Sequence, residues 1–185
     1  MFDEIQRFRT FNRFKSVYRR NSVGDRKESC AEHTWSALVL ADMFLTHNTH
    51  NLDTLRVYEL LLYHDAVEII TGDTPLHPDV PREDKTQAEA LAAQELARHI
   101  PQLLKHKYLA LHDEYAKKRT PEARFAKAVD ALDALILALD HPQDFEGYTK
   151  EFFLEKKGPV FEEFPEIKDV FYDVLTYIDE QGHFQ

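Results

Sequence analysis

Histidine and aspartate residues stand at three places where the surrounding sequence predicts buried helices. His33 opens one apolar stretch, His64 and Asp65 directly follow another, and Asp130 lies beside the apolar stripe of a third. A carboxylate next to a buried helix face is costly unless a partner compensates its charge. Two imidazoles and two carboxylates that converge suit a divalent Mn, Co, Fe, Ni or Zn ion and leave coordination positions open. The pattern favours a catalytic metal site.

Two further acids lie close to the His64-Asp65 pair. Glu68 comes one helical turn after His64, on the same face, and Asp73 follows in the segment Thr71–Pro75 that breaks the helix. A His-Asp dipeptide by itself is more often structural than catalytic. Three carboxylates beside one imidazole repel one another without a cation, however. These neighbours therefore strengthen the interpretation as a metal site.

Helical periodicity dominates the segments that must position these residues. Thr120, followed by Pro121, provides an N-cap and a favoured first residue for the helix that carries Asp130. No segment shows the sustained alternation of a strand, so we predict an all-α, single-domain helical bundle over residues 1–185, with a core at 8–140 and a C-terminal helical extension at 145–182. The predicted helices cover Asp3–Phe14, His33–Leu45, Thr54–Tyr63, Lys85–Ile100, Pro101–Lys118, Pro121–Leu139 and Pro165–Ile178.

The helices predicted at His33–Leu45 and Thr54–Tyr63 are apolar on nearly every side. A helix that is apolar all round is normally buried in the centre of a protein. We therefore expect both to be buried on most faces, with Trp35 in the core.

Composition and charge exclude several classes of function. The chain has 185 residues, 43% hydrophobic and 30% charged, as in one compact soluble domain. A net charge of -10 argues against a nucleic-acid duplex as partner, because phosphate backbones are bound by clustered Lys and Arg. Cys30 is the single cysteine, which excludes an intrachain disulfide and fits a reducing compartment. The sequence has neither a signal-peptide core nor a membrane-spanning stretch, so we predict a cytoplasmic protein without membrane contact.

Three blocks in this sequence resemble, in the same order, the HD-domain phosphohydrolase superfamily. They are Glu28–Trp35, His64–Asp73 and Ala128–Leu132. The resemblance covers roughly Phe8 to Leu139, most of the chain. The set of histidines and aspartates is common to the whole superfamily. The AEHTW and EIITGD blocks are narrower and are similar to the branch of 5'-deoxynucleotidases and their relatives.

The resemblance implies an all-helical fold and one divalent metal ion, for which Mg joins the candidates named above. Glu68 and Asp73 match the acids that act beside the metal in that branch, and either could orient water or transfer a proton. The positions that match the metal ligands are His33, His64, Asp65 and Asp130.

The branch also has an Arg-Trp pair near its N-terminus that contacts substrate. Arg13-Phe14 matches it here, with a different aromatic residue. The segment between this pair and His33 is longer than in the family, so Arg19, Arg20 or Arg26 could hold the phosphate instead.

The resemblance thus implies a phosphomonoesterase that acts on (deoxy)nucleoside 5'-monophosphates, as a homodimer. Hydrolysis of a signalling nucleotide, di-iron oxygenase chemistry and nucleotide binding without catalysis are the alternatives. A second metal would favour the oxygenase, and His77 is the first histidine to consider as its ligand. The acidic segment from Phe145 onward matches no motif and could form a lid or a dimer face.

Overall fold

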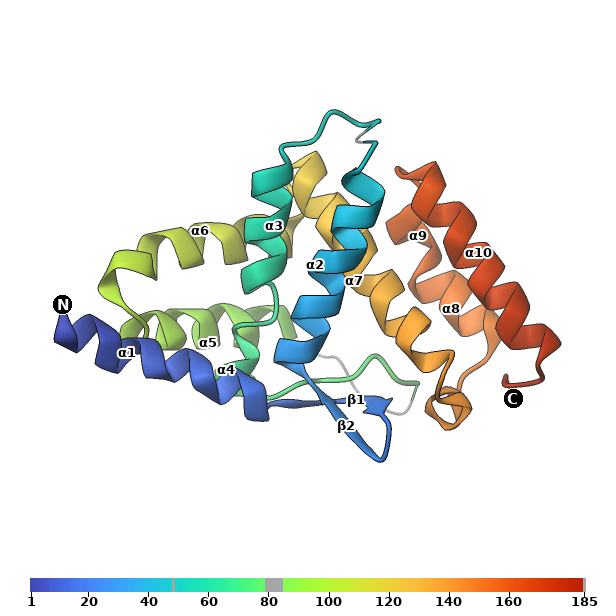
Figure 1. The fold of residues 1–185 in the computed structure, drawn as a ribbon, viewed down its shortest axis with the longest axis horizontal. Helices are drawn as coiled ribbons and strands as arrows, with labels where there is room; N and C mark the ends of the chain where they lie inside the picture. The colour runs from blue at the N-terminus through green and yellow to red at the C-terminus, as the bar shows by residue number, and fades with distance from the viewer. Residues whose placement is uncertain (48, 79–84, 185) are drawn as a thin grey trace.

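The protein is a bundle of helices with one small β-hairpin (Figure 1). The computed structural model describes residues 1–47, 49–78 and 85–184. Two 3-10 turns cover Arg13–Ser16 and Pro142–Phe145, and the hairpin consists of β1 (Tyr18–Val23) and β2 (Arg26–Ser29). The all-α class predicted from the sequence is confirmed. The helices are α1 (Phe2–Asn12), α2 (Cys30–Leu45), α3 (Thr54–Tyr63), α4 (Glu68–Thr71), α5 (Lys85–His99), α6 (Gln102–Lys117), α7 (Pro121–Ala138), α8 (Lys150–Lys156), α9 (Gly158–Phe161) and α10 (Pro165–Glu180).

Helices α2, α3 and α7 pack together at the centre. Figure 1 shows α1, α5 and α6 on one side of them and α8, α9 and α10 on the other. A large cluster of buried apolar side chains joins the central helices to α10, and a smaller one joins α4, α5 and α6. Members of the large cluster include Ala37, Leu61, Leu132, Phe171 and Leu175.

Local capping interactions fix where two of the central helices begin. The Ser29 side chain accepts a hydrogen bond from the backbone N–H of Glu32, and the Glu32 carboxylate accepts one from the backbone N–H of Ser29, so α2 starts with a complete capping box. Thr120 caps α7 through the backbone N–H of Ala123, with Pro121 at the first position as predicted. Both caps give hydrogen-bond partners to backbone N–H groups of the first turn, which have none within the helix.

The hairpin is the element that the sequence pattern did not predict. β1 and β2 pair antiparallel, with Tyr18 opposite Ser29, around a turn where Gly24 has a φ of 59°. The expectation of no strand was wrong here because β1 reads YRRNSV, which is polar and has no alternation of apolar residues. Its anchors are polar as well: Ser22 donates from its backbone nitrogen and its Oγ to the buried Asp144.

The outer face of α2 is exposed, contrary to the expectation of a helix buried on most faces. Trp35 is 68% exposed, Val39 52% and Met43 57%, and their spacing of four residues places them in one stripe. Ala37 and Ala41 are fully buried on the other side. The expectation failed because an apolar side chain can remain on the surface of a folded protein. Among the described residues, no helix is both long and apolar enough to span a membrane.

Candidate metal centre and its cavity

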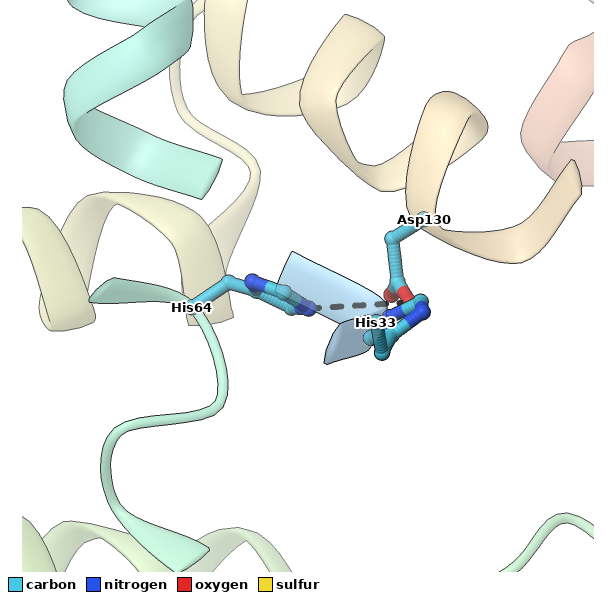
Figure 2. A group of neighbouring side chains, drawn as sticks. All are labelled: His33, His64 and Asp130. Carbon is cyan, nitrogen blue, oxygen red and sulfur yellow. Dashed lines mark hydrogen bonds and ion pairs between the residues drawn. The ribbon is translucent and has the colours of Figure 1, made fainter. Parts of the chain in front are cut away.

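Four side chains from three parts of the chain converge at one point. His33 comes from α2, His64 and Asp65 follow α3, and Asp130 comes from α7. His33 Nε2 lies 3.0 Å from Asp130 Oδ1, and His64 Nε2 lies 3.1 Å from Asp65 Oδ2. The two remaining histidine-to-carboxylate distances are both 3.8 Å. Figure 2 shows His33, His64 and Asp130 pointing toward one another.

Hydrogen bonds on the far side of each imidazole orient the two histidines. His33 Nδ1 is 2.8 Å from Asp133 Oδ2, an atom to which Ser36 Oγ also donates at 2.7 Å. His64 Nδ1 donates to the carbonyl oxygen of Leu61 at 2.7 Å. A proton held on Nδ1 leaves the Nε2 lone pair directed at the centre.

The donor set at this point fits a divalent metal ion. His64 Nε2 is buried and makes no hydrogen bond with any described residue, although Asp65 Oδ2 is close to it. A buried nitrogen without a hydrogen-bond partner is costly, and a metal ion is the natural partner for an imidazole lone pair. Two imidazole nitrogens and two carboxylate oxygens suit a divalent transition metal. His33, His64 and Asp130 are close enough for their ligand atoms to share one ion.

Charges around the centre shift the pKa values of its members. Burial and the charge of Arg19 act to lower the pKa of His33, but Asp130 and Asp133 outweigh them and raise it to about 9. Burial opposes ionisation of Asp65, yet the His64 imidazole and Arg19 hold the pKa of that carboxyl below its usual range. The arrangement therefore keeps the candidate carboxylate ligand ionised.

Glu68 is buried beside this centre, in the short helix α4. Its Oε2 accepts a hydrogen bond from the thiol of Cys30, 3.0 Å away. Burial and the negative charge of Asp65 raise the pKa of Glu68 to about 8, so this carboxyl takes up a proton near neutral pH. Asp73 lies in the loop that follows α4.

A cavity of about 640 Å³ opens beside the candidate ligands. Both carboxylates of the centre line it, and so do Glu68 and Asp73, whereas the two histidines are buried outside its lining. Its basic side chains are Arg19, Arg20, Lys118, Lys127, Lys156 and Lys157. Its aromatic side chains come from the C-terminal third and are Phe145, Tyr148, Phe152 and Phe153.

Arg19, one of the residues expected from sequence to contact substrate, lies in the cavity wall. Its Nη1 is 2.9 Å from Asp65 Oδ2, and its Nε is 3.2 Å from Glu28 Oε2. Arg20, named as an alternative, also lines the cavity and lies over the ring of Tyr148. The hairpin places both arginines there.

Arg13 and Phe14 lie elsewhere. Arg13 donates to the carbonyl oxygen of Ile69 at 3.1 Å, and Phe14 packs on the smaller apolar cluster, so neither lines the cavity. Arg26, the remaining alternative, is paired with Glu32 on the surface. Sequence spacing could not show which of these arginines lines the cavity, because that depends on the position of the hairpin.

A second group of residues could hold a metal ion by distance alone. It consists of Glu28, His33 and Asp133. The contact between His33 Nδ1 and Asp133 has the geometry of a hydrogen bond. This group therefore orients the His33 imidazole from the side opposite Nε2. His77 lines the cavity and packs edge-on against Tyr148, and it belongs to neither candidate metal group among the described residues.

Sequence reasoning missed several residues that surround the centre. Lys127 and Asp133 lie three residues before and after Asp130, so one helical turn in either direction was the available signal. Cys30, which contacts Glu68, lies three residues before His33 and had the same signal. Tyr115 contacts Asp130 through the fold and had no such signal.

The chain matches a known protein family over most of its length. A family model described as "HD domain" matches residues 11–168. The chain belongs to the HD-domain family. This confirms the resemblance carried by the three sequence blocks.

Two curated relatives of this HD-domain chain carry the name 5'-deoxynucleotidase. The "5'-deoxynucleotidase HDDC2" of Bos taurus is 31% identical over 134 residues, which are 71% of this chain and 63% of that protein. A "5'-deoxynucleotidase" of Yersinia pestis is 32% identical over 148 residues, 75% of this chain and 72% of that protein. The chain therefore spans somewhat less than two thirds of the bovine relative.

A solved structure shares almost the whole fold. The crystal structure of a "Predicted metal-dependent phosphohydrolase" from Magnetospirillum magnetotacticum superposes with a TM-score of 0.86 at 26% identity. The superposition covers 97% of this HD-domain chain and 93% of that one.

Proposed function

We propose that this HD-domain protein hydrolyses the phosphomonoester bond of (deoxy)nucleoside 5'-monophosphates. One observation carries the proposal: two histidines and two aspartates converge at the wall of a cavity that also holds two further acids and several cations. The cavity, at about 640 Å³, lies within the usual range for small-molecule sites. The names of the curated relatives support the same reaction.

His33, His64, Asp65 and Asp130 would hold one divalent ion. When bound, such an ion supplies Lewis acidity, which lowers the pKa of water and polarises a phosphoryl oxygen. The hydrogen bonds on His33 Nδ1 and His64 Nδ1 keep both Nε2 atoms turned toward the shared point.

Glu68 acts as the general base in this proposal. Its carboxylate takes one proton from the attacking water, whose oxygen forms the new bond to phosphorus. Burial raises the pKa of Glu68, and a raised pKa makes its carboxylate a stronger proton acceptor. The thiol of Cys30 donates to Oε2, which leaves Oε1 for the water.

Asp73 serves the leaving group. As the bond between phosphorus and the 5'-oxygen breaks, that oxygen becomes the hydroxyl of the nucleoside by gaining a proton, which Asp73 in the cavity wall would deliver. Arg19 brings positive charge to the cavity wall beside Asp65 and would stabilise the phosphate oxygens. The products are a nucleoside and inorganic phosphate.

Phosphate release from a panel of deoxy- and ribonucleoside 5'-monophosphates tests the proposal. The protein is stripped of metal and then refilled separately with Mn, Co, Mg or Fe. We expect release that requires a metal and differs between deoxy and ribo substrates. No release from protein that holds one ion would contradict the proposal and favour a signalling nucleotide or a binding role.

We also propose that the protein is cytoplasmic, as its composition indicates, and a homodimer, as the family resemblance implies. Light scattering should then give about twice the 21.7 kDa mass of one chain. A mass of one chain at micromolar concentration would contradict this assembly.

A further inference from the structure

Two cations flank the candidate metal centre, one beside each carboxylate. Arg19 Nη1 lies 2.9 Å from Asp65 Oδ2, and Lys127 Nζ lies 2.7 Å from Asp130 Oδ2. Both cations line the cavity. Both carboxylates belong to candidate metal ligands. Positive charge therefore lies on two sides of the candidate centre.

Of the two cations, Lys127 has the greater freedom to meet a ligand. Its side chain is 35% exposed, against 12% for Arg19, whose guanidinium is also paired with both Asp65 and Glu28. An ammonium group has three N–H donors. One points to Asp130 Oδ2 and a second, at 3.4 Å, to the hydroxyl of Tyr115. The third is left for a ligand in the cavity.

Asp130 does not depend on Lys127 for its orientation. The hydroxyl of Tyr115 donates to the same Oδ2 at 2.7 Å, and this tyrosine is buried. Tyr115 thereby fixes the outer oxygen of Asp130 and leaves Oδ1 facing His33. Because Tyr115 already holds Oδ2, the hydrogen bond from Lys127 adds little to the orientation of the carboxylate. Tyr115 therefore has the orienting role, and Lys127 does not.

We propose that Lys127 binds the phosphoryl group of the substrate from the Asp130 side of the centre. The inference rests on the proposed function, because its ligand is the phosphomonoester dianion of the same site. Lysine suits this task because its compact charge on a flexible stem can contact any oxygen of a phosphate. Lys127, beside Asp130, and Arg19, beside Asp65, then contact the phosphate from the two carboxylate sides of the centre.

Binding of inorganic phosphate to Mn-saturated protein, measured by calorimetry, tests the inference without turnover. We expect Lys127→Gln to weaken phosphate binding roughly ten-fold or more, the usual effect of losing a charge-assisted hydrogen bond. Tyr115→Phe removes the other donor to Asp130 Oδ2 and keeps the charge. Lys156→Gln removes an equal charge from the same cavity. Both controls should weaken phosphate binding less than about three-fold.

Three results would overturn the inference. Phosphate affinity unchanged in Lys127→Gln excludes the contact. An equal loss in Tyr115→Phe means that Lys127 acts only through the position of Asp130. An equal loss in Lys156→Gln means that only the total charge of the cavity matters.

A measurement on the wild-type protein covers the case in which Lys127→Gln does not fold or retain Mn. Amine-specific acetylation is followed at each lysine by mass spectrometry, with and without phosphate. Protection of Lys127 beyond that of Lys156 supports the inference, and equal labelling overturns it. Because neither test uses a nucleotide, failure of the proposed reaction shows separately in the nucleotide panel.

Discussion

Three of the four candidate ligands at the metal centre are oriented by a neighbour on their outer side. Asp133 and the carbonyl oxygen of Leu61 fix the two imidazoles, while Tyr115 fixes Asp130. A side chain held in this way loses little further freedom when it binds an ion, which favours affinity and a single geometry. Glu68 is held comparably, by Cys30, but outside the ligand group.

Glu68 should therefore be needed for turnover and not for metal binding. Glu68→Gln keeps the shape of the side chain and removes its capacity to accept a proton. We expect kcat to fall by about 10²- to 10⁴-fold, the usual contribution of general acid–base catalysis, with an unchanged metal-to-protein ratio. Loss of the metal from this variant would instead identify Glu68 as a ligand.

Removal of the metal should make stability depend on pH. His33 has a pKa of about 9 in the folded protein against an ordinary 6.5, and Glu68 has about 8 against 4.5. Groups whose pKa is raised by folding stabilise the folded state at low pH, and this contribution is lost as the pH rises through the raised pKa. The free energy of unfolding of the stripped protein should fall by on the order of 5 kcal/mol between pH 6 and 9.

Urea unfolding at several pH values, with chelator or with excess Mn, measures this dependence. Metal should stabilise the protein most at high pH, because His33 must lose its proton to bind an ion. A stripped protein whose stability increases over this range would contradict the charge distribution described for the centre.

Among the elements, the hairpin determines which arginines reach the cavity. It places Arg19 and Arg20 at the cavity wall, and the bonds from Ser22 to Asp144 attach it to the turn after α7. Asn21 adds a hydrogen bond to the carbonyl oxygen of Ala134. These contacts are polar, so the position of the hairpin depends on a few hydrogen bonds.

Asp144→Ala should detach the hairpin from α7. The change leaves the buried backbone nitrogen and Oγ of Ser22 without their acceptor, which costs about 1–3 kcal/mol. Urea unfolding measures this cost. Lys27→Ala is the comparison: it removes a half-exposed cation 3.6 Å from Asp144, with its hydrogen bonds to Ser22 Oγ and the Arg20 carbonyl oxygen, but leaves Asp144 as the acceptor for Ser22, and should cost less than about 1 kcal/mol. Equal costs for the two variants would contradict the anchoring role.

For the molecule as a whole, the C-terminal third is part of both the core and the site. Phe171 and Leu175 of α10 belong to the apolar cluster of the central helices, and Tyr148 and Phe153 line the cavity. Tyr148 also donates to the carbonyl oxygen of Leu76 at 2.6 Å, which links this segment to the loop after Asp73. The segment for which the sequence left a lid or a dimer face open thus contributes part of the cavity wall.

The sequence predicted what depends on helical spacing and on local caps. The start of α7 at Pro121 and the buried stripe that ends near Ile178 follow from such patterns. The hairpin and the exposure of Trp35 did not, because they depend on which polar groups and faces meet in three dimensions. The same limit applies to the site. Helical spacing from Asp130 could have identified Lys127, whereas no local pattern could have identified the C-terminal residues that line the cavity.

The number of metal ions bound per chain tests the central claim most directly. The stripped protein is dialysed against Co²⁺, and the bound metal is measured for the wild type and for His64→Gln. The account predicts one ion per wild-type chain and its loss in the variant, with phosphate release lost in parallel. Two ions per chain, or a variant that keeps its ion, would contradict a single centre formed by His33, His64, Asp65 and Asp130.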